Sequence, residues 1–171
     1  MRKLLLLFFI CLGIAAYAGK PYVGIEGGFA PDRTYGSFDE TLGFAGVNTG
    51  YELNVGKFAF IPQIGLGYEN FKEKSIWPGG SELKTIHKSN FYASLSLNAD
   101  VKIYRGLSLY TSPMVRYTTN DYAYYHWAMY WTFGAAYRFS RFKVFCAYNQ
   151  QVTEMYHKRL NPISAGVQVF F

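Results

Sequence analysis

Eight charged residues lie in segments of the sequence that are otherwise apolar or small, and their types fit ion pairing. Four are acidic and four are basic: Glu26, Glu52, Glu69 and Asp100, and Lys102, Arg116, Arg138 and Lys143. Carboxylates and cations that leave water together should pair, because an unpaired buried charge is costly. Whether these residues meet depends on the elements that hold them.

Other kinds of chemistry have little support in the sequence. The three histidines and Cys146 show no metal-ligand spacing, and no glycine-rich phosphate loop is present, so we expect no metal and no cofactor. The formal net charge is +6, but the basic residues do not form the patch that nucleic-acid binding requires. We therefore expect no nucleic-acid partner.

The segment Phe91–Ile103 indicates the kind of element that carries the charges. Its odd-numbered residues are all apolar, and none of its even-numbered residues is aliphatic. A period of two sends the two sets to opposite faces of a strand. A strand of this length reaches roughly 43 Å, which crosses a hydrocarbon layer even at a tilt of about 40°. Strands of soluble proteins are usually about half as long.

Seven other segments repeat this alternation. The eight strands are predicted at Tyr22–Phe29, Ala45–Leu53, Phe58–Tyr68, Phe91–Ile103, Leu107–Tyr117, Trp127–Phe139, Phe142–Gln151 and Ile163–Phe171. Only a closed sheet lets strands cross lipid, and eight is the smallest strand number of such barrels. The fold class is therefore all-β, an eight-stranded antiparallel up-and-down transmembrane β-barrel. Phe142–Gln151 fits least well, because Phe145 falls on the inward face.

In this barrel the eight charged residues face the lumen. The interior of an eight-stranded barrel has room only for side chains. We favour a salt-bridged plug that closes the lumen, and the alternative is a channel for small ions.

The N-terminus predicts export. Arg2 and Lys3 precede an apolar run from Leu4 to Ala16, which is followed by Ala16-Tyr17-Ala18. A basic start, a short apolar core and an A-x-A site are typical of a secretory signal peptide. We expect cleavage after residue 18, which leaves residues 19–171 as one barrel domain.

The predicted connections alternate between short and long. The short ones lie at residues 54–56, 104–106 and 140–141, and the long ones at 31–40, 72–88, 119–124 and 153–160. Up-and-down barrels have short periplasmic turns and longer external loops. Cations of the long connections are either lipopolysaccharide contacts or ordinary solvated charges: Lys72, Lys74, Lys84, Lys88, Lys158 and Arg159.

The signal peptide, the strand number, the alternating connections and the terminal Phe171 together resemble small outer-membrane β-barrel proteins of the OmpA/OmpX/opacity type. The resemblance implies the outer membrane of a Gram-negative bacterium, a non-enzymatic structural or surface-interaction role, and external loops that meet a host or surface ligand. It also implies an assembly signal for the barrel assembly machinery, formed by Ile163, Ala165, Val167, Val169 and Phe171.

Two alternatives remain. His87-Lys88-Ser89-Asn90 resembles the H-x-S-N motif of outer-membrane lipid A deacylases, in which His and Ser act as base and nucleophile. The motif lies earlier in the chain than in that family, and no acidic residue follows it on the same face. A secreted soluble barrel with a ligand inside is the second alternative, and it needs apolar residues inside rather than outside.

Overall fold

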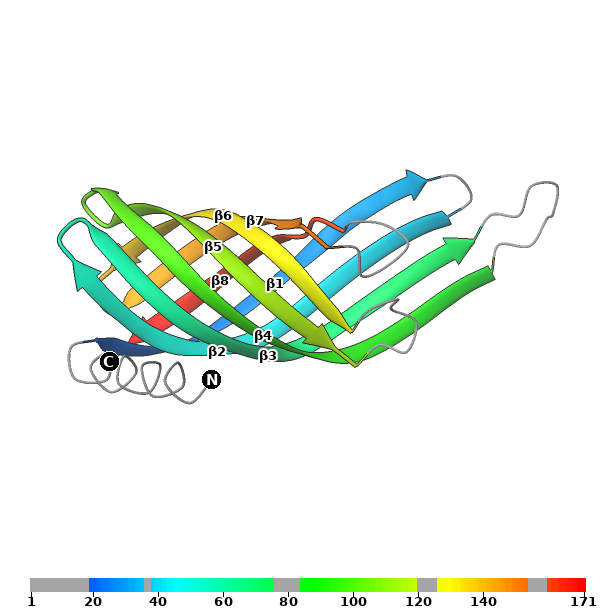
Figure 1. Ribbon diagram of the computed structural model, residues 1–171, viewed down its shortest axis with the longest axis horizontal. Helices are drawn as coiled ribbons and strands as arrows, with labels where there is room; N and C mark the ends of the chain where they lie inside the picture. Colours follow the sequence, from blue (N-terminus) through cyan, green and yellow to red (C-terminus); the bar gives the residue numbers. More distant parts are fainter. Residues whose placement is uncertain (1–18, 36–37, 76–83, 120–125, 154–159) are drawn as a thin grey trace, which may run out of the picture.

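The computed structural model describes residues 19–35, 38–75, 84–119, 126–153 and 160–171, and they form eight antiparallel strands in one closed barrel (Figure 1). The strands are β1 Lys20–Tyr35, β2 Phe38–Val55, β3 Phe58–Ser75, β4 Lys84–Tyr104, β5 Leu107–Thr118, β6 Trp127–Phe139, β7 Phe142–Gln151 and β8 Ile163–Phe170. Each strand pairs with the next, and β1 pairs with β8 to close the sheet. The predicted all-β barrel is confirmed, whereas the predicted signal peptide lies outside the described residues. No helix in the described ranges is long and apolar enough to cross a membrane.

The alternation along each strand separates an apolar outer wall from a polar interior. On β4, Leu95 and Leu97 are exposed, whereas Ser94, Ser96 and Asp100 between and beyond them are buried. The same division on the other strands leaves a continuous set of aliphatic and aromatic side chains on the outside. This is the reverse of a soluble barrel, as the sequence predicted.

Tight turns join strands at one end of the barrel, which we call the turn end. The connections there are residues 56–57, 105–106 and 140–141, and each has the two residues of a short hairpin. Gly56 and Gly106 have positive φ angles of 62° and 92°, which glycine adopts without steric cost. Lys20 and Phe171 also lie at this end, where the Phe171 N–H donates to the Pro21 carbonyl over 3.0 Å. The predicted short connections are confirmed.

At the opposite end, the loop end, two predicted loops are largely strand. β1 and β2 continue through most of residues 31–40, and β3 and β4 continue through much of 72–88. β8 pairs with β1 only as far as Phe29, and β5 pairs with β4 only as far as Tyr92. The loop-end parts of β1–β4 therefore form a sheet extension beyond the barrel, residues 30–35, 38–43, 70–75 and 84–90 (Figure 1).

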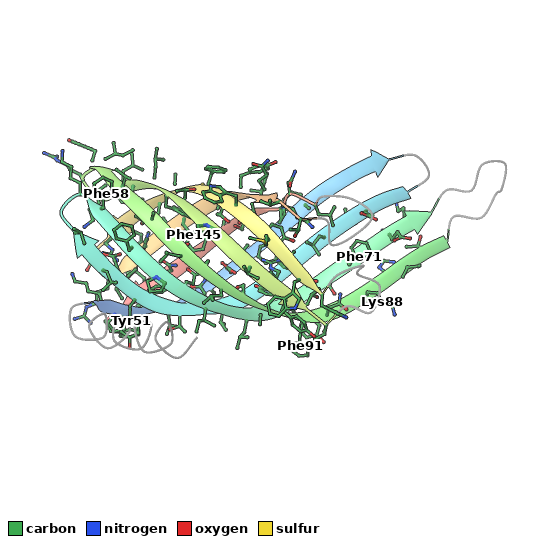
Figure 2. The ribbon with its side chains drawn as sticks, in the orientation of Figure 1. Tyr51, Phe58, Phe71, Lys88, Phe91 and Phe145 are labelled. Atoms are coloured by element: carbon green, nitrogen blue, oxygen red, sulfur yellow. The ribbon has the colours of Figure 1, made fainter. Side chains whose placement is uncertain are left out.

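Glycines make room for large side chains inside the narrow barrel. Phe145 on β7 points inward, where its ring lies 6.4 Å from that of Tyr110 (Figure 2). A Cβ atom added at Gly166 would lie 2.5 Å from the Phe145 Cζ atom. The absence of side chains at such positions lets β7 keep its predicted bounds despite an inward aromatic residue.

Candidate functional site

The lumen near the turn end holds two ion pairs. Both guanidinium NH2 groups of Arg138 donate to the Glu52 carboxylate, each over 2.6 Å, and the Lys143 ammonium lies 2.5 Å from Asp100 Oδ2. Arg138 also lies 3.8 Å above the ring of Phe170. This bidentate geometry fixes the plane of the guanidinium as well as its position, which favours a rigid closure of the lumen.

A third ion pair lies deeper, toward the loop end. Arg116 Nη1 is 3.7 Å from Glu69 Oε2, and the Thr118 hydroxyl donates to Glu69 Oε1 over 2.6 Å. The guanidinium carbon lies 4.3 to 5.3 Å from three ring centroids, those of Phe44, Tyr92 and Tyr130. Arg116 is 1% exposed, so its guanidinium is almost completely shielded from solvent. Cation–π attraction is stronger at such desolvated sites than at exposed ones.

Sequence reasoning missed this aromatic cage. The inward parity of Tyr92 and Tyr130 follows from the predicted strands and identifies both residues as lumen side chains. Phe44 lies one residue before the predicted start of its strand, and the longer observed β2 brings it into the barrel.

Two of the eight predicted lumen charges have no ion pair among the described residues. Glu26 accepts hydrogen bonds from the Asn48 amide over 3.3 Å and the Tyr92 hydroxyl over 3.5 Å. Lys102 is exposed at the turn end, where its ammonium donates to Asn54 Oδ1. The expectation that all eight charges pair is thus wrong, because neutral side chains take the place of the missing partners.

A small polar cavity lies between the two charged layers. Its volume is about 40 Å³, and its lining includes Glu26, Gln63, Asn98 and Gln168. A space of this size holds only a few water molecules. Beside the cavity, the Tyr22 hydroxyl donates to Gln63 Oε1 over 2.7 Å. The described interior is therefore filled by side chains on both sides of this cavity.

The His87 and Ser89 pair of the hydrolase alternative lies on the exposed outer face of β4. The Ser89 hydroxyl donates to Asn70 Oδ1 over 2.6 Å, so an amide and not His87 is its hydrogen-bond acceptor. His87 is paired across the sheet with Lys72 of β3. In the described part of the chain, the two residues do not form the base–nucleophile contact that such catalysis uses.

The cations predicted to meet lipopolysaccharide do not share one face. Lys72 and Lys74 have the outward parity of Tyr68 on β3, whereas Lys88 is paired with the buried Phe71 and has inward parity. Only the backbone of Lys84 is described, and Lys158 and Arg159 lie outside the described residues. The described cations that the sequence suggested as one group therefore lie on opposite faces of the sheet extension.

The predicted assembly signal occupies the outer face of β8. Its members alternate with inward residues: Ile163, Ala165, Val167, Val169 and Phe171. Ile163, Ala165 and Phe171 are exposed, and the two valines are half-buried. The inward Phe170 lies 5.0 Å from the ring of Tyr22. No group of three or more potential metal-binding side chains occurs among the described residues.

A closed eight-stranded antiparallel barrel with an apolar outer wall and a charged, filled interior is the fold of outer-membrane β-barrels. The structure is similar to that of the Yersinia pestis outer membrane protein Ail, determined in a phospholipid bilayer nanodisc, with a TM-score of 0.53 and 13% identity over 90% of this chain and 99% of that chain. The β domain of the Bordetella autotransporter BrkA covers 90% of this chain at 9% identity, with a TM-score of only 0.40. The sequence matches no protein-family model and no curated protein. The likeness to Ail establishes the fold.

Proposed function

We propose that this protein resides in the outer membrane of a Gram-negative bacterium as a non-enzymatic barrel with a closed lumen and a surface-exposed sheet extension. The observation that carries the proposal is the outer wall. Aliphatic side chains such as Leu66 and Leu95 cover its middle. Aromatic pairs flank them, Tyr68–Phe91 and Tyr117–Trp127 toward the loop end and Phe139–Phe142 at the turn end. Two aromatic rows around an apolar band are typical of membrane barrels.

The lengths of the connections indicate which end of the barrel faces the periplasm. Short turns of such barrels face the periplasm, so the sheet extension reaches the cell exterior. There it presents backbone edges and charged side chains to a host or surface ligand, or acts as a structural element. Cell fractionation with surface proteolysis of intact cells tests location and orientation together. We expect the protein in the outer membrane with cleavage confined to the loop end, and a soluble periplasmic protein would refute the proposal.

Lipopolysaccharide is the lipid partner that we propose for the outer face. Lys72 and Lys74 lie beyond Tyr68 on the same face of β3, at the height where phosphates would lie above an aromatic row. An apolar groove of about 550 Å³ lies beside Tyr68 and Phe91, with a floor of small residues that includes Ala45 and Ala93. We propose that an acyl chain lies along this groove, with its phosphate directed toward the lysines.

A matched pair of variants tests this partner. Lys72→Gln should reduce the rise in unfolding temperature that added lipopolysaccharide causes, because it removes an outward cation. Lys88→Gln removes the same charge from the opposite face of the sheet extension and should leave the rise intact. Equal effects of both variants would show that the contact is not confined to the outer face.

The outer face of β8 is the proposed contact with the barrel assembly machinery. Phe171 is 73% exposed, so packing inside the folded barrel does not account for its ring. Deletion of Phe171 should lower the outer-membrane level of the protein and leave unassembled chains in the periplasm. Undiminished assembly of the deletion variant would remove the sorting role.

A further inference from the structure

A second cavity opens at the turn end, separate from the polar cavity inside the barrel. This turn-end pocket has a volume of about 240 Å³ and extends from the Arg138 and Lys143 ion pairs to the turn at residues 104–106. Lys102 and Arg105 line it on the solvent side. Ile103 and Tyr104, both exposed on the outer wall, also contribute to the lining, so the pocket reaches from the lumen mouth to the rim of the barrel.

Positive charge exceeds negative charge in this pocket. Its cations are Lys102, Arg105, Arg138 and Lys143, and its carboxylates are Glu52 and Asp100. Both carboxylates are buried and already engaged by Arg138 and Lys143. No ion pair of the described residues includes Lys102 or Arg105, so two cationic groups remain in excess.

The excess donors have neutral partners. The Lys102 ammonium donates to the amide oxygen of Asn54, and the Arg105 guanidinium lies 5.4 Å from the Tyr104 ring centroid.

The surrounding rim strengthens the positive potential. Lys20, Lys57 and Arg141 are exposed at the same end of the barrel. The Lys57 carbonyl accepts from the Lys102 backbone N–H over 2.9 Å, which places the β2–β3 turn beside the pocket. A cluster of one sign at the mouth of a low-dielectric barrel raises the local concentration of anions.

We propose that the turn-end pocket binds a phosphate-bearing anion between Lys102 and Arg105. Arginine and lysine both suit phosphate oxygens, and arginine adds directional contacts. The phosphate belongs either to an anionic phospholipid of the adjacent leaflet, whose chains would lie along Tyr104 and Ile103, or to a soluble anion. This inference goes beyond the proposed function, and only its lipid alternative rests on the proposed residence in a membrane.

The test uses the folded protein in an uncharged, phosphate-free detergent and in lipid nanodiscs. Inorganic phosphate is titrated in detergent, while backbone amide chemical shifts of Arg105 and Gly106 are followed, with Gly43 of the sheet extension at the loop end as reference. Nanodiscs of phosphatidylcholine are compared with an equal mixture of phosphatidylcholine and phosphatidylglycerol. We expect saturable shifts at Arg105 and Gly106 and much smaller ones at Gly43.

Two double variants that remove the same charge supply the control. The double variant Lys102→Gln with Arg105→Gln should weaken phosphate binding at least about tenfold, since each substitution removes a charge-assisted hydrogen bond to the phosphate. Lys57 and Arg141 lie outside the pocket lining. Lys57→Gln with Arg141→Gln should therefore weaken phosphate binding by only about a factor of two. The single variants Lys102→Gln and Arg105→Gln provide the measurement if the double variant folds poorly.

The two arms identify the source of the phosphate. Shifts with phosphatidylglycerol as well as with inorganic phosphate support a lipid headgroup, and shifts with inorganic phosphate alone support a soluble anion. The absence of saturable shifts with both probes would overturn the proposal. Equal weakening by the two double variants would also overturn it, because it would indicate diffuse surface charge rather than a pocket.

Discussion

Arg116 is the side chain whose environment most clearly separates a plug from a solvated pore. A water-filled lumen would hydrate a guanidinium, whereas this one is enclosed by three aromatic rings and one carboxylate. Glu69 balances its charge, and the rings stabilise it further.

A double-mutant cycle tests this dependence. Arg116→Met leaves Glu69 buried without its cation and should cost about 3–5 kcal/mol of unfolding free energy. Adding Glu69→Gln should recover much of that loss, because no uncompensated charge remains. Denaturant unfolding of the barrel in detergent measures both. Additive losses would show that the two residues act independently.

Leu97 and Leu107 test the assignment of the outer wall to lipid. Both are exposed apolar residues, but Leu97 lies in the middle of the β4 wall and Leu107 lies at the turn end. Leu97→Arg should cost about 2–4 kcal/mol for the folded barrel in a bilayer, and Leu107→Arg about 0–1 kcal/mol. Folding equilibria in lipid vesicles give both values. Equal costs would place the bilayer elsewhere on the barrel.

The sequence predicted which charged residues face the lumen more accurately than it predicted their partners. Parity within a strand depends only on the residue order, so Glu52, Arg138 and Asp100 were placed inside correctly. Pairing depends on the register of strands far apart in sequence and on side-chain reach. For that reason Glu26 bonds to neutral groups, and Lys102 turns toward Asn54.

At the level of the strands, the alternation predicted the bounds of β6 and β7 correctly but predicted β1 to β4 to be shorter than they are. The segments at residues 31–40 and 72–88 are rich in charged residues, which are uncommon in membrane-spanning strands. Outside the membrane this restriction does not apply. There, cross-strand pairing continues as long as a partner strand is present, and buried residues such as Leu42 and Phe71 hold the sheet extension against Leu160.

Two glycines of β2 test the packing between strands. A Cβ atom at Gly46 would collide with the Tyr92 hydroxyl and the Leu66 carbonyl, whereas one at Gly43 meets nothing within 4 Å. Gly46→Ala should cost about 1–3 kcal/mol by overpacking. Gly43→Ala should be neutral or stabilise by up to about 1 kcal/mol, since it restricts the unfolded chain. Thermal unfolding measures the difference, and similar effects of the two would mean that the lumen is loosely packed.

For the whole molecule, the ion pairs and the cage form two layers that close the barrel around a cavity of about 40 Å³. The strand number predicted a filled interior, because eight strands enclose a space only wide enough for side chains. The position of each charge along its predicted strand also indicates the two layers, because Glu69 and Arg116 fall near the external end and the other paired charges fall near the periplasmic end. The two-layer arrangement explains how a barrel with six paired lumen charges stays closed.

The most direct measurement of this closure is the conductance of the folded protein in a planar lipid bilayer. The three ion pairs and the caged Arg116 predict little or no steady current in the unmodified barrel. Arg138→Gln combined with Lys143→Gln leaves Glu52 and Asp100 uncompensated, and this variant should either unfold more readily or pass small ions. Large, stable channels in the unmodified protein would contradict the closed lumen.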